Sequence, residues 1–272
     1  MVGMGRRSQP RPNQVILGDA LEVMRGWPDD CVDHCIADPP FNMSKKRGLG
    51  WAFSSHVTMQ EQWDTFGEDE FFEFNVAWLR EVVRVVKPNG NILVFGTFHN
   101  IYQLGFILQS GLNRRILNSV VWYKPNAQPN ITARMLTEST EQLIWAVNGT
   151  PEGKTKATKW TFNYQRAKEL NNDKQMRNMW EFSVTPRSER ALGKHPSQKP
   201  LRLLERLIEL GTNAGDLVVD PFGGAGTLAL AAEKLGRKFV LIESVEEYAN
   251  LAQSRLAEAR LAEQRMPPDT GE

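Results

Sequence analysis

Short apolar runs alternate with longer amphipathic stretches along most of the chain. The clearest amphipathic stretch covers residues 70–86, where apolar residues recur at steps of three and four until Lys87-Pro88-Asn89-Gly90. This pattern predicts a helix, and similar patterns predict helices over residues 201–210, 231–235 and 246–264. The apolar runs are typical of buried parallel strands, and they cover residues 15–17, 32–37, 91–95, 119–123, 142–147, 217–219 and 239–242. Their alternation predicts an α/β fold with helices on both faces of a sheet.

The segment at residues 150–198 interrupts this alternation with polar, basic and aromatic residues. Residues 151–199 contain 11 Lys/Arg and 5 Asp/Glu, whereas the rest of the chain contains 22 and 27. A basic segment of this kind can contact nucleic-acid phosphates, or it can be a solvated surface loop, and charge alone leaves both interpretations open. We interpret the segment as an insertion with its own function. Residues 1–12 and 266–272 are interpreted as flexible tails.

Size and composition restrict the class of protein. The chain has 272 residues, of which 41% are hydrophobic, enough for one large domain or for one domain with a small insertion. No apolar run approaches the roughly 18 residues that span a membrane, so we expect no membrane contact. Cys31 and Cys35 are the only cysteines, which favours a reducing cytoplasm. They lack the further ligands that a structural zinc needs, so we predict an inert, buried Cys35 and no metal.

A glycine-rich sequence follows the apolar run at residues 217–219. It reads Asp220-Pro221-Phe222-Gly223-Gly224-Ala225-Gly226-Thr227 and leads into a predicted helix. Glycines let the backbone turn tightly and approach a ligand without a Cβ in the way. Glu243 ends the next apolar run, 19 residues after Gly224, which suits a carboxylate that accepts both hydroxyls of a ribose. This half predicts an adenosine-binding βαβ unit, but the motif alone does not distinguish a dinucleotide from S-adenosylmethionine.

The apolar run that ends at Ala37 continues into Asp38-Pro39-Pro40-Phe41. This sequence suits a planar base that carries an amino group. The Asp38 carboxylate and the Pro39 carbonyl can each accept one N–H of an amine, and the prolines keep the turn rigid without competing donors. Phe41 can stack on the base, which contributes roughly 1–3 kcal/mol. The motif therefore predicts a pocket for an amino-bearing base at the carboxyl end of a strand.

The two motifs together resemble motifs IV and I of the amino-group DNA methyltransferases. Four further stretches resemble segments of the same family. They are Gly18-Asp19-Ala20-Leu21, Trp122-Tyr123-Lys124-Pro125, Glu141-Gln142-Leu143-Ile144-Trp145-Ala146 and His195-Pro196-Ser197-Gln198-Lys199-Pro200. The last of these resembles motif X, which borders the methionine part of the cofactor. Because the Asp38 motif precedes the glycine motif, the order is similar to that of the β class of these enzymes. The resemblance covers residues 13–257.

The resemblance implies a Rossmann-like S-adenosylmethionine-dependent methyltransferase fold with a seven-stranded, mostly parallel sheet. Residues 13–149 would form a catalytic half, residues 150–194 a target-recognition insert and residues 195–265 a cofactor-binding half. In such enzymes the target base is flipped out of duplex DNA, and here Asp38, Pro39, Pro40 and Phe41 would receive it. The residues expected at S-adenosylmethionine are Asp19, Ala20, Lys199, Asp220, Phe222, Gly223, Gly224, Ala225, Gly226, Thr227 and Glu243.

The acid at position 38 also indicates the target. Family members with Asp there mostly methylate N6 of adenine, whereas cytosine-N4 enzymes more often carry Ser, so adenine is favoured and cytosine N4 is the alternative. Methylation of RNA or of a protein glutamine is a weaker alternative, because those enzymes tend to carry Asn. A nicotinamide dehydrogenase would leave the Asp38 motif unexplained. A module that binds DNA without chemistry is disfavoured by the intact Asp38.

Double-stranded DNA is the expected partner. Lys45, Lys46 and Arg47, in a predicted loop at residues 42–59, and Lys124 are expected to contact it. The resemblance implies a restriction-modification or orphan modification methylase that associates with the nucleoid through DNA. It also admits a homodimer, because relatives often form dimers.

Overall fold

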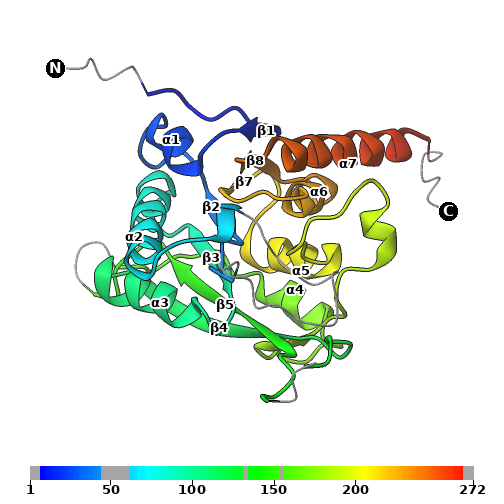
Figure 1. Cartoon of the computed structure of the whole chain (residues 1–272). Coiled ribbons are helices and arrows are strands. Elements are labelled where there is room, and N and C mark those ends of the chain that lie inside the picture. The colour runs from blue at the N-terminus through cyan, green and yellow to red at the C-terminus, as the bar shows by residue number, and fades with distance from the viewer. Residues whose placement is uncertain (1–6, 44–61, 131–133, 153–155, 266–272) are drawn as a thin grey trace.

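A single mixed sheet organises the chain. A computed structural model describes residues 7–43, 62–130, 134–152 and 156–265 (Figure 1). The sheet has eight strands in the order β1-β8-β7-β2-β3-β5-β4-β6. Their bounds are β1 Gln14–Leu17, β2 His34–Ala37, β3 Asn91–Gly96, β4 Arg115–Tyr123, β5 Thr140–Val147, β6 Met179–Glu181, β7 Leu217–Asp220 and β8 Lys238–Glu243. Neighbouring strands are parallel except where β5 pairs with β3 and with β4.

Helices cover both faces of the sheet, as predicted from the sequence (Figure 1). One face carries α1 (Ala20–Arg25), α2 (Glu68–Val85), α3 (Ile101–Phe106) and a π-helical turn, Ile107–Gly111. The other carries α4 (Tyr164–Glu169), α5 (Leu201–Gly211), α6 (Thr227–Lys234) and α7 (Glu246–Arg265). Short 3-10 turns lie at Gln62–Asp64 and Arg187–Arg190.

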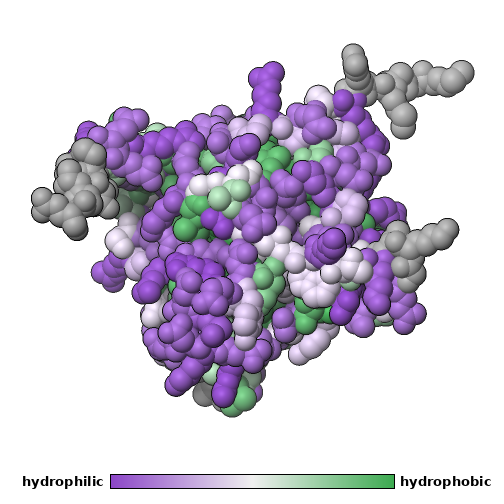
Figure 2. Space-filling model, turned by 180° about the vertical axis from the view of Figure 1, so that it is seen from behind, coloured by the Kyte–Doolittle hydropathy of each residue, from purple (hydrophilic) through white to green (hydrophobic). Residues whose placement is uncertain are grey.

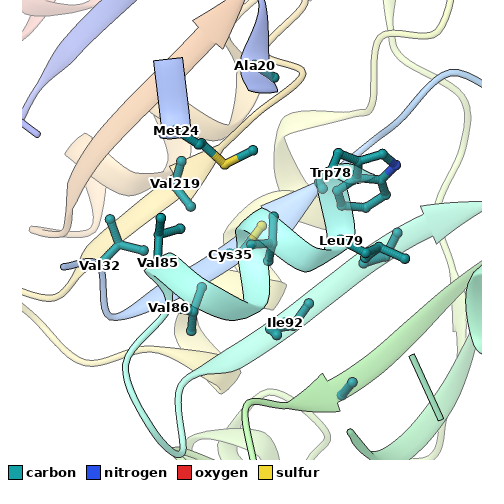
Figure 3. Close-up of a cluster of buried hydrophobic side chains, with 14 of the residues drawn as sticks. Ala20, Met24, Val32, Cys35, Trp78, Leu79, Val85, Val86, Ile92 and Val219 are labelled. Atoms are coloured by element: carbon teal, nitrogen blue, oxygen red, sulfur yellow. The ribbon is translucent and has the colours of Figure 1, made fainter. Parts of the chain in front are cut away.

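The two faces bury separate hydrophobic clusters because successive strand residues point to opposite sides. In β2, Cys35 and Ala37 belong to the cluster under α1 and α2, whereas Ile36 belongs to the cluster under α5 and α6. Figure 3 shows the first cluster, in which Cys35 lies among side chains from the sheet and from α2. Cys35 is fully buried and free, as predicted, and burial raises the pKa of its thiol well above the ordinary value.

The sheet has one strand more than the seven expected. The additional strand is β6, which comes from the basic insert and pairs in parallel with the outer edge of β4, where Trp180 lies opposite Trp122. Trp180 is buried there, and its indole N–H donates to the Arg177 carbonyl. The insert therefore covers a strand edge that would otherwise present unpaired amides. Only three residues pair, which is too short a run to be visible in the hydrophobic pattern.

The face of the molecule seen in Figure 2 is mostly hydrophilic, with smaller apolar patches between polar side chains. No helix in the described ranges is long and apolar enough to cross a membrane. In the same ranges no group of three or more His, Cys, Asp or Glu could hold a metal ion.

Candidate active site

The carboxyl ends of four adjacent parallel strands form the candidate site. β1, β8, β7 and β2 end at Leu17, Glu243, Asp220 and Ala37, so the residues expected at a cofactor and at a target base meet on one edge of the sheet. Two cavities open there, one of about 270 Å³ and one of about 40 Å³. Asp38, His195, Ser197 and Phe222 line both. The motifs from the two ends of the chain thus form a single site.

The larger cavity contains Glu243, Asp19 and Ala20. The Glu243 carboxylate accepts the amide N–H of Gly224 at 2.7 Å and that of Val245 at 2.8 Å. Burial raises the pKa of Glu243, and the amide donors oppose that shift. Asp19 also caps α1, because its side chain accepts the amide N–H of Glu22 at 3.0 Å. These carboxylates are held in place by backbone donors, so their orientation does not depend on a ligand.

The glycine loop has no room for side chains at its tight positions. A Cβ on Gly223 would lie 2.1 Å from Leu241, which is fully buried in β8. Gly226 has φ +76° and lies against Ala252 of α7. Behind the loop, Arg255 of α7 donates to the Ala225 carbonyl at 2.5 Å and to the Thr227 hydroxyl at 3.1 Å. The sequence analysis missed Arg255, whose only signal is a basic residue beside the apolar Leu256.

Asp38 occupies the boundary between the two cavities. Its Oδ2 accepts from the Lys199 ammonium at 2.5 Å, and its buried Oδ1 has no hydrogen-bond partner among the described residues. Burial raises the pKa of Asp38 to about 6, and the nearby Lys199 lowers it only in part. A buried acceptor without a donor costs roughly 1–3 kcal/mol. Asp38 Oδ1 is therefore an acceptor that a bound donor would satisfy.

The remaining residues of the Asp38 motif form a buried turn. Pro39, Pro40 and Phe41 are all buried, and the Pro40 carbonyl accepts from the Asn100 side-chain amide at 3.4 Å. The Lys199 ammonium lies 5.2 Å from the centre of the Phe41 ring, within the range of a cation–π contact.

Asp64 holds this turn from the opposite side. Its carboxylate accepts three successive backbone N–H groups, from Phe41 at 2.7 Å, Asn42 at 2.6 Å and Met43 at 2.8 Å. Asp64 is fully buried, so these charge-assisted bonds are shielded from water. The sequence analysis missed Asp64 because no local motif connects it with a turn that lies more than twenty positions earlier.

Asp64→Asn is expected to lower the rate of a reaction at this site by about 10- to 100-fold, because the amide nitrogen would face a backbone donor and displace Phe41. Single-turnover kinetics measures this, and Asp69→Asn, an exposed acid at the start of α2, is the control. A rate equal to that of the wild type would contradict this role.

The two predicted lysines of the site lie in a buried ion-pair chain. Lys199 lines the smaller cavity beside Gly224, but its ammonium is directed to Asp38 and also lies 3.3 Å from Glu141 Oε2. Lys124, which we expected to contact DNA, pairs with Glu141 Oε1 at 3.1 Å, and its side chain is only 14% exposed. Lys45, Lys46 and Arg47 lie outside the described residues.

Burial keeps two further groups of the site uncharged at neutral pH. Burial raises the pKa of Asp220 to about 8, and the carboxylates of Asp38 and Glu243 contribute to this rise. Burial also lowers the pKa of His195 to about 4, helped by Lys199. The neutral His195 ring stacks on Trp63 with centroids 5.8 Å apart and meets the edge of Tyr248 at 4.3 Å. His195 therefore serves as an aromatic wall between the glycine loop and α7.

The pKa of Asp38 predicts an acid limit for activity. Accepting an N–H requires the carboxylate, so kcat/KM for DNA should be constant above about pH 7 and fall about tenfold per unit below pH 6. Initial-rate assays between pH 5 and 8 measure this, with cofactor affinity determined at each pH as the control. An unchanged kcat/KM at pH 5 would contradict a reactive Asp38 carboxylate.

Comparisons with known proteins agree on one family. A family model described as DNA methylase, for N6 and N4 enzymes, matches residues 32–254. The chain is 38% identical over 249 residues to the type II methyltransferase M2.DpnII of Streptococcus pneumoniae, covering 90% of each protein. It is also 38% identical to M2.LlaDCHI of Lactococcus lactis subsp. cremoris, covering 89% of this chain and 88% of that protein.

Solved structures share the fold. The M1.HpyAVI complex with S-adenosylmethionine superposes with a TM-score of 0.67 and 29% identity, covering 89% of this chain and 98% of that chain. The cytosine-N4-specific PvuII DNA methyltransferase superposes with a TM-score of 0.70 and 18% identity, covering 97% and 89%, and this likeness concerns the fold alone.

Proposed function

Because the chain belongs to the DNA methylase family, we propose that it transfers a methyl group from S-adenosylmethionine to the N6 amino group of adenine in double-stranded DNA. The observation that carries the proposal is the unpaired, buried Oδ1 of Asp38, on the boundary between the cavity that contains Glu243 and the turn that contains Phe41. The amino group of a bound base would supply the hydrogen-bond donor that this oxygen lacks.

The residues that line the larger cavity suit S-adenosylmethionine in their chemistry. The Glu243 carboxylate in the larger cavity suits the two hydroxyls of a ribose, and Gly223 and Gly224 of the glycine loop line the adjoining smaller cavity. Asp19, Ala20 and Phe222 would border the adenine. When bound, S-adenosylmethionine supplies an electrophilic methyl group on a cationic sulfonium.

The Asp38 turn would receive the target base after it has been flipped from the duplex. The Asp38 carboxylate and the Pro39 carbonyl would each accept one N–H of the amine, which directs the nitrogen lone pair toward the methyl donor. Phe41 would stack on the base. The methylated amine is strongly acidic and loses its proton readily, so these residues act mainly by positioning.

Adenine is preferred to cytosine because the first residue of the motif is Asp38. The matching family model covers both N6 and N4 enzymes, so the choice rests on this residue alone. The relatives M2.DpnII and M2.LlaDCHI are named as type II methyltransferases. We therefore assign this chain to the modification component of a restriction-modification system, associated with the nucleoid through DNA.

Residues 150–194 are assigned to target recognition, between a catalytic half at 13–149 and a cofactor half at 195–265. Support comes from the basic charge of the insert and from β6, which attaches it to β4. The C-terminal end of β4 leads to Lys124, which pairs with Glu141, and Glu141 also faces Lys199. The insert is thus attached to a strand that ends at the active site. A homodimer stays a prediction.

Methyl incorporation identifies the substrate. Purified protein with tritiated S-adenosylmethionine should label duplex DNA and leave RNA and protein unlabelled. Single-molecule sequencing of plasmid DNA from expressing cells should then report N6-methyladenine in one sequence context. N4-methylcytosine in place of N6-methyladenine would overturn the adenine assignment, and label in RNA or protein alone would overturn the DNA assignment.

A further inference from the structure

The Lys199 ammonium contacts three oxygen atoms, two as a hydrogen-bond donor and the third, on Glu141, as an ion pair. It donates to Asp38 Oδ2 at 2.5 Å and to the Ser197 carbonyl at 3.2 Å, and it lies 3.3 Å from Glu141 Oε2. The side chain is 5% exposed, so water does not compete for these contacts. A lysine has a long, flexible stem, and these three contacts together define where its charge lies.

Glu141 is the second member of this arrangement and lies at the start of β5. Its two oxygens contact two different lysines, because Oε1 accepts from Lys124 at 3.1 Å and Oε2 faces Lys199. These lysines hold the pKa of Glu141 below its ordinary value in spite of burial. Charges therefore alternate along a buried chain from Lys124 through Glu141 and Lys199 to Asp38.

The contact between Lys199 and Asp38, at the end of this row of ion pairs, determines which Asp38 oxygen is free to accept a hydrogen bond. Lys199 occupies Oδ2, and Oδ1 has no partner in the described part of the molecule. A carboxylate can rotate about its terminal bond, and contact with a fixed ammonium restricts that rotation. Loss of Glu141 would leave Lys199 with Ser197 and Asp38 as its oxygen contacts, so the ammonium could move and Asp38 could turn with it.

We propose that Glu141 is a positioning residue for methyl transfer, which acts through Lys199 to keep one oxygen of Asp38 directed at the target amine. This inference rests on the proposed function. Glu141 contacts neither the larger cavity nor the glycine loop, so it should influence the chemical step and not cofactor binding.

The test is a double-mutant cycle on the full-length protein with duplex DNA. Glu141→Gln should lower the single-turnover rate about 10- to 100-fold, while the Kd for S-adenosylmethionine and the KM for DNA change less than about threefold. In a Lys199→Met background the same substitution should have no further effect, because residues that act through one another are not additive. Glu205→Gln, which breaks an exposed ion pair with Lys234, is the matched control.

The outcomes separate this inference from the function on which it rests. If the wild type labels no DNA, the proposed function fails. If the wild type labels DNA and Glu141→Gln does so at the same rate, only the role of Glu141 fails. The role also fails if Glu141→Gln lowers the single-turnover rate by the same factor in the Lys199→Met background as in the wild type. If Glu141→Gln does not fold, Glu141→Asp, which keeps the charge but shortens the reach, should lower the rate, and a wild-type rate would overturn the proposal.

Discussion

Asp38→Ala is expected to lower the rate of methyl transfer by roughly 100- to 1000-fold, the range for loss of one preorganised electrostatic group. The substitution removes the carboxylate that would accept from the target amine, and it leaves Glu243 and the glycine loop intact. Binding of S-adenosylmethionine should therefore stay within about threefold of the wild type. A tritiated-methyl assay on duplex DNA measures the rate, and titration calorimetry measures the affinity.

Removing Asp38 also leaves Lys199 with fewer partners, and breaking a buried ion pair can cost about 3–5 kcal/mol. Asp38→Asn separates the two effects, because it fills the same volume and still offers an oxygen to Lys199. We expect Asp38→Asn to fold like the wild type and to lose most of the transfer rate. Unchanged turnover in either variant would contradict the role of Asp38.

Gly223→Ala is expected to weaken cofactor binding and to lower the free energy of unfolding by about 1–3 kcal/mol, the cost of adding a methyl group to a packed core. The new Cβ would lie 2.1 Å from the Leu241 side chain, so either the loop or β8 has to move. Movement of the loop would carry the Gly224 amide away from Glu243. Urea denaturation measures the stability, and calorimetry measures the affinity.

Gly215→Ala provides the contrast. Gly215 has φ +86° and nothing within 4 Å of its would-be Cβ. Alanine there should cost about 1–2 kcal/mol of stability through backbone strain alone and should leave cofactor affinity unchanged. If Gly223→Ala binds S-adenosylmethionine as tightly as the wild type does, close approach at the loop is not needed for binding.

Local patterns in the sequence predicted the elements that have strong periodicity. Residues 70–86 and 246–264 were predicted as helices, and the structure places α2 at Glu68–Val85 and α7 at Glu246–Arg265. All seven predicted strands are present. The short helices α1, α3 and α4 were missed because six residues complete fewer than two turns, which is too short for a periodic pattern.

The residues of the candidate site also differ in whether the sequence alone could reveal them. Residues within a contiguous motif, such as Asp38 and the glycine loop, could be found from their neighbours along the chain. Asp64 and Arg255 act across the fold, on backbone or side chains that lie at least twenty positions away. The pairing of Lys124 with Glu141 could not be predicted from the sequence either, and contact of Lys124 with DNA stays a prediction.

The strand order has a consequence for how the protein is made. The first two strands, β1 and β2, are not neighbours, because β7 and β8 lie between them. During synthesis the ribosome releases β1 and β2 long before residues 217–243 exist, and their facing edges stay unpaired until then. Pairing across so much of the sequence is slow and leaves edges open to aggregation. We therefore expect a chain that stops before Leu217 to bind no cofactor, and such an incomplete chain could modify no DNA.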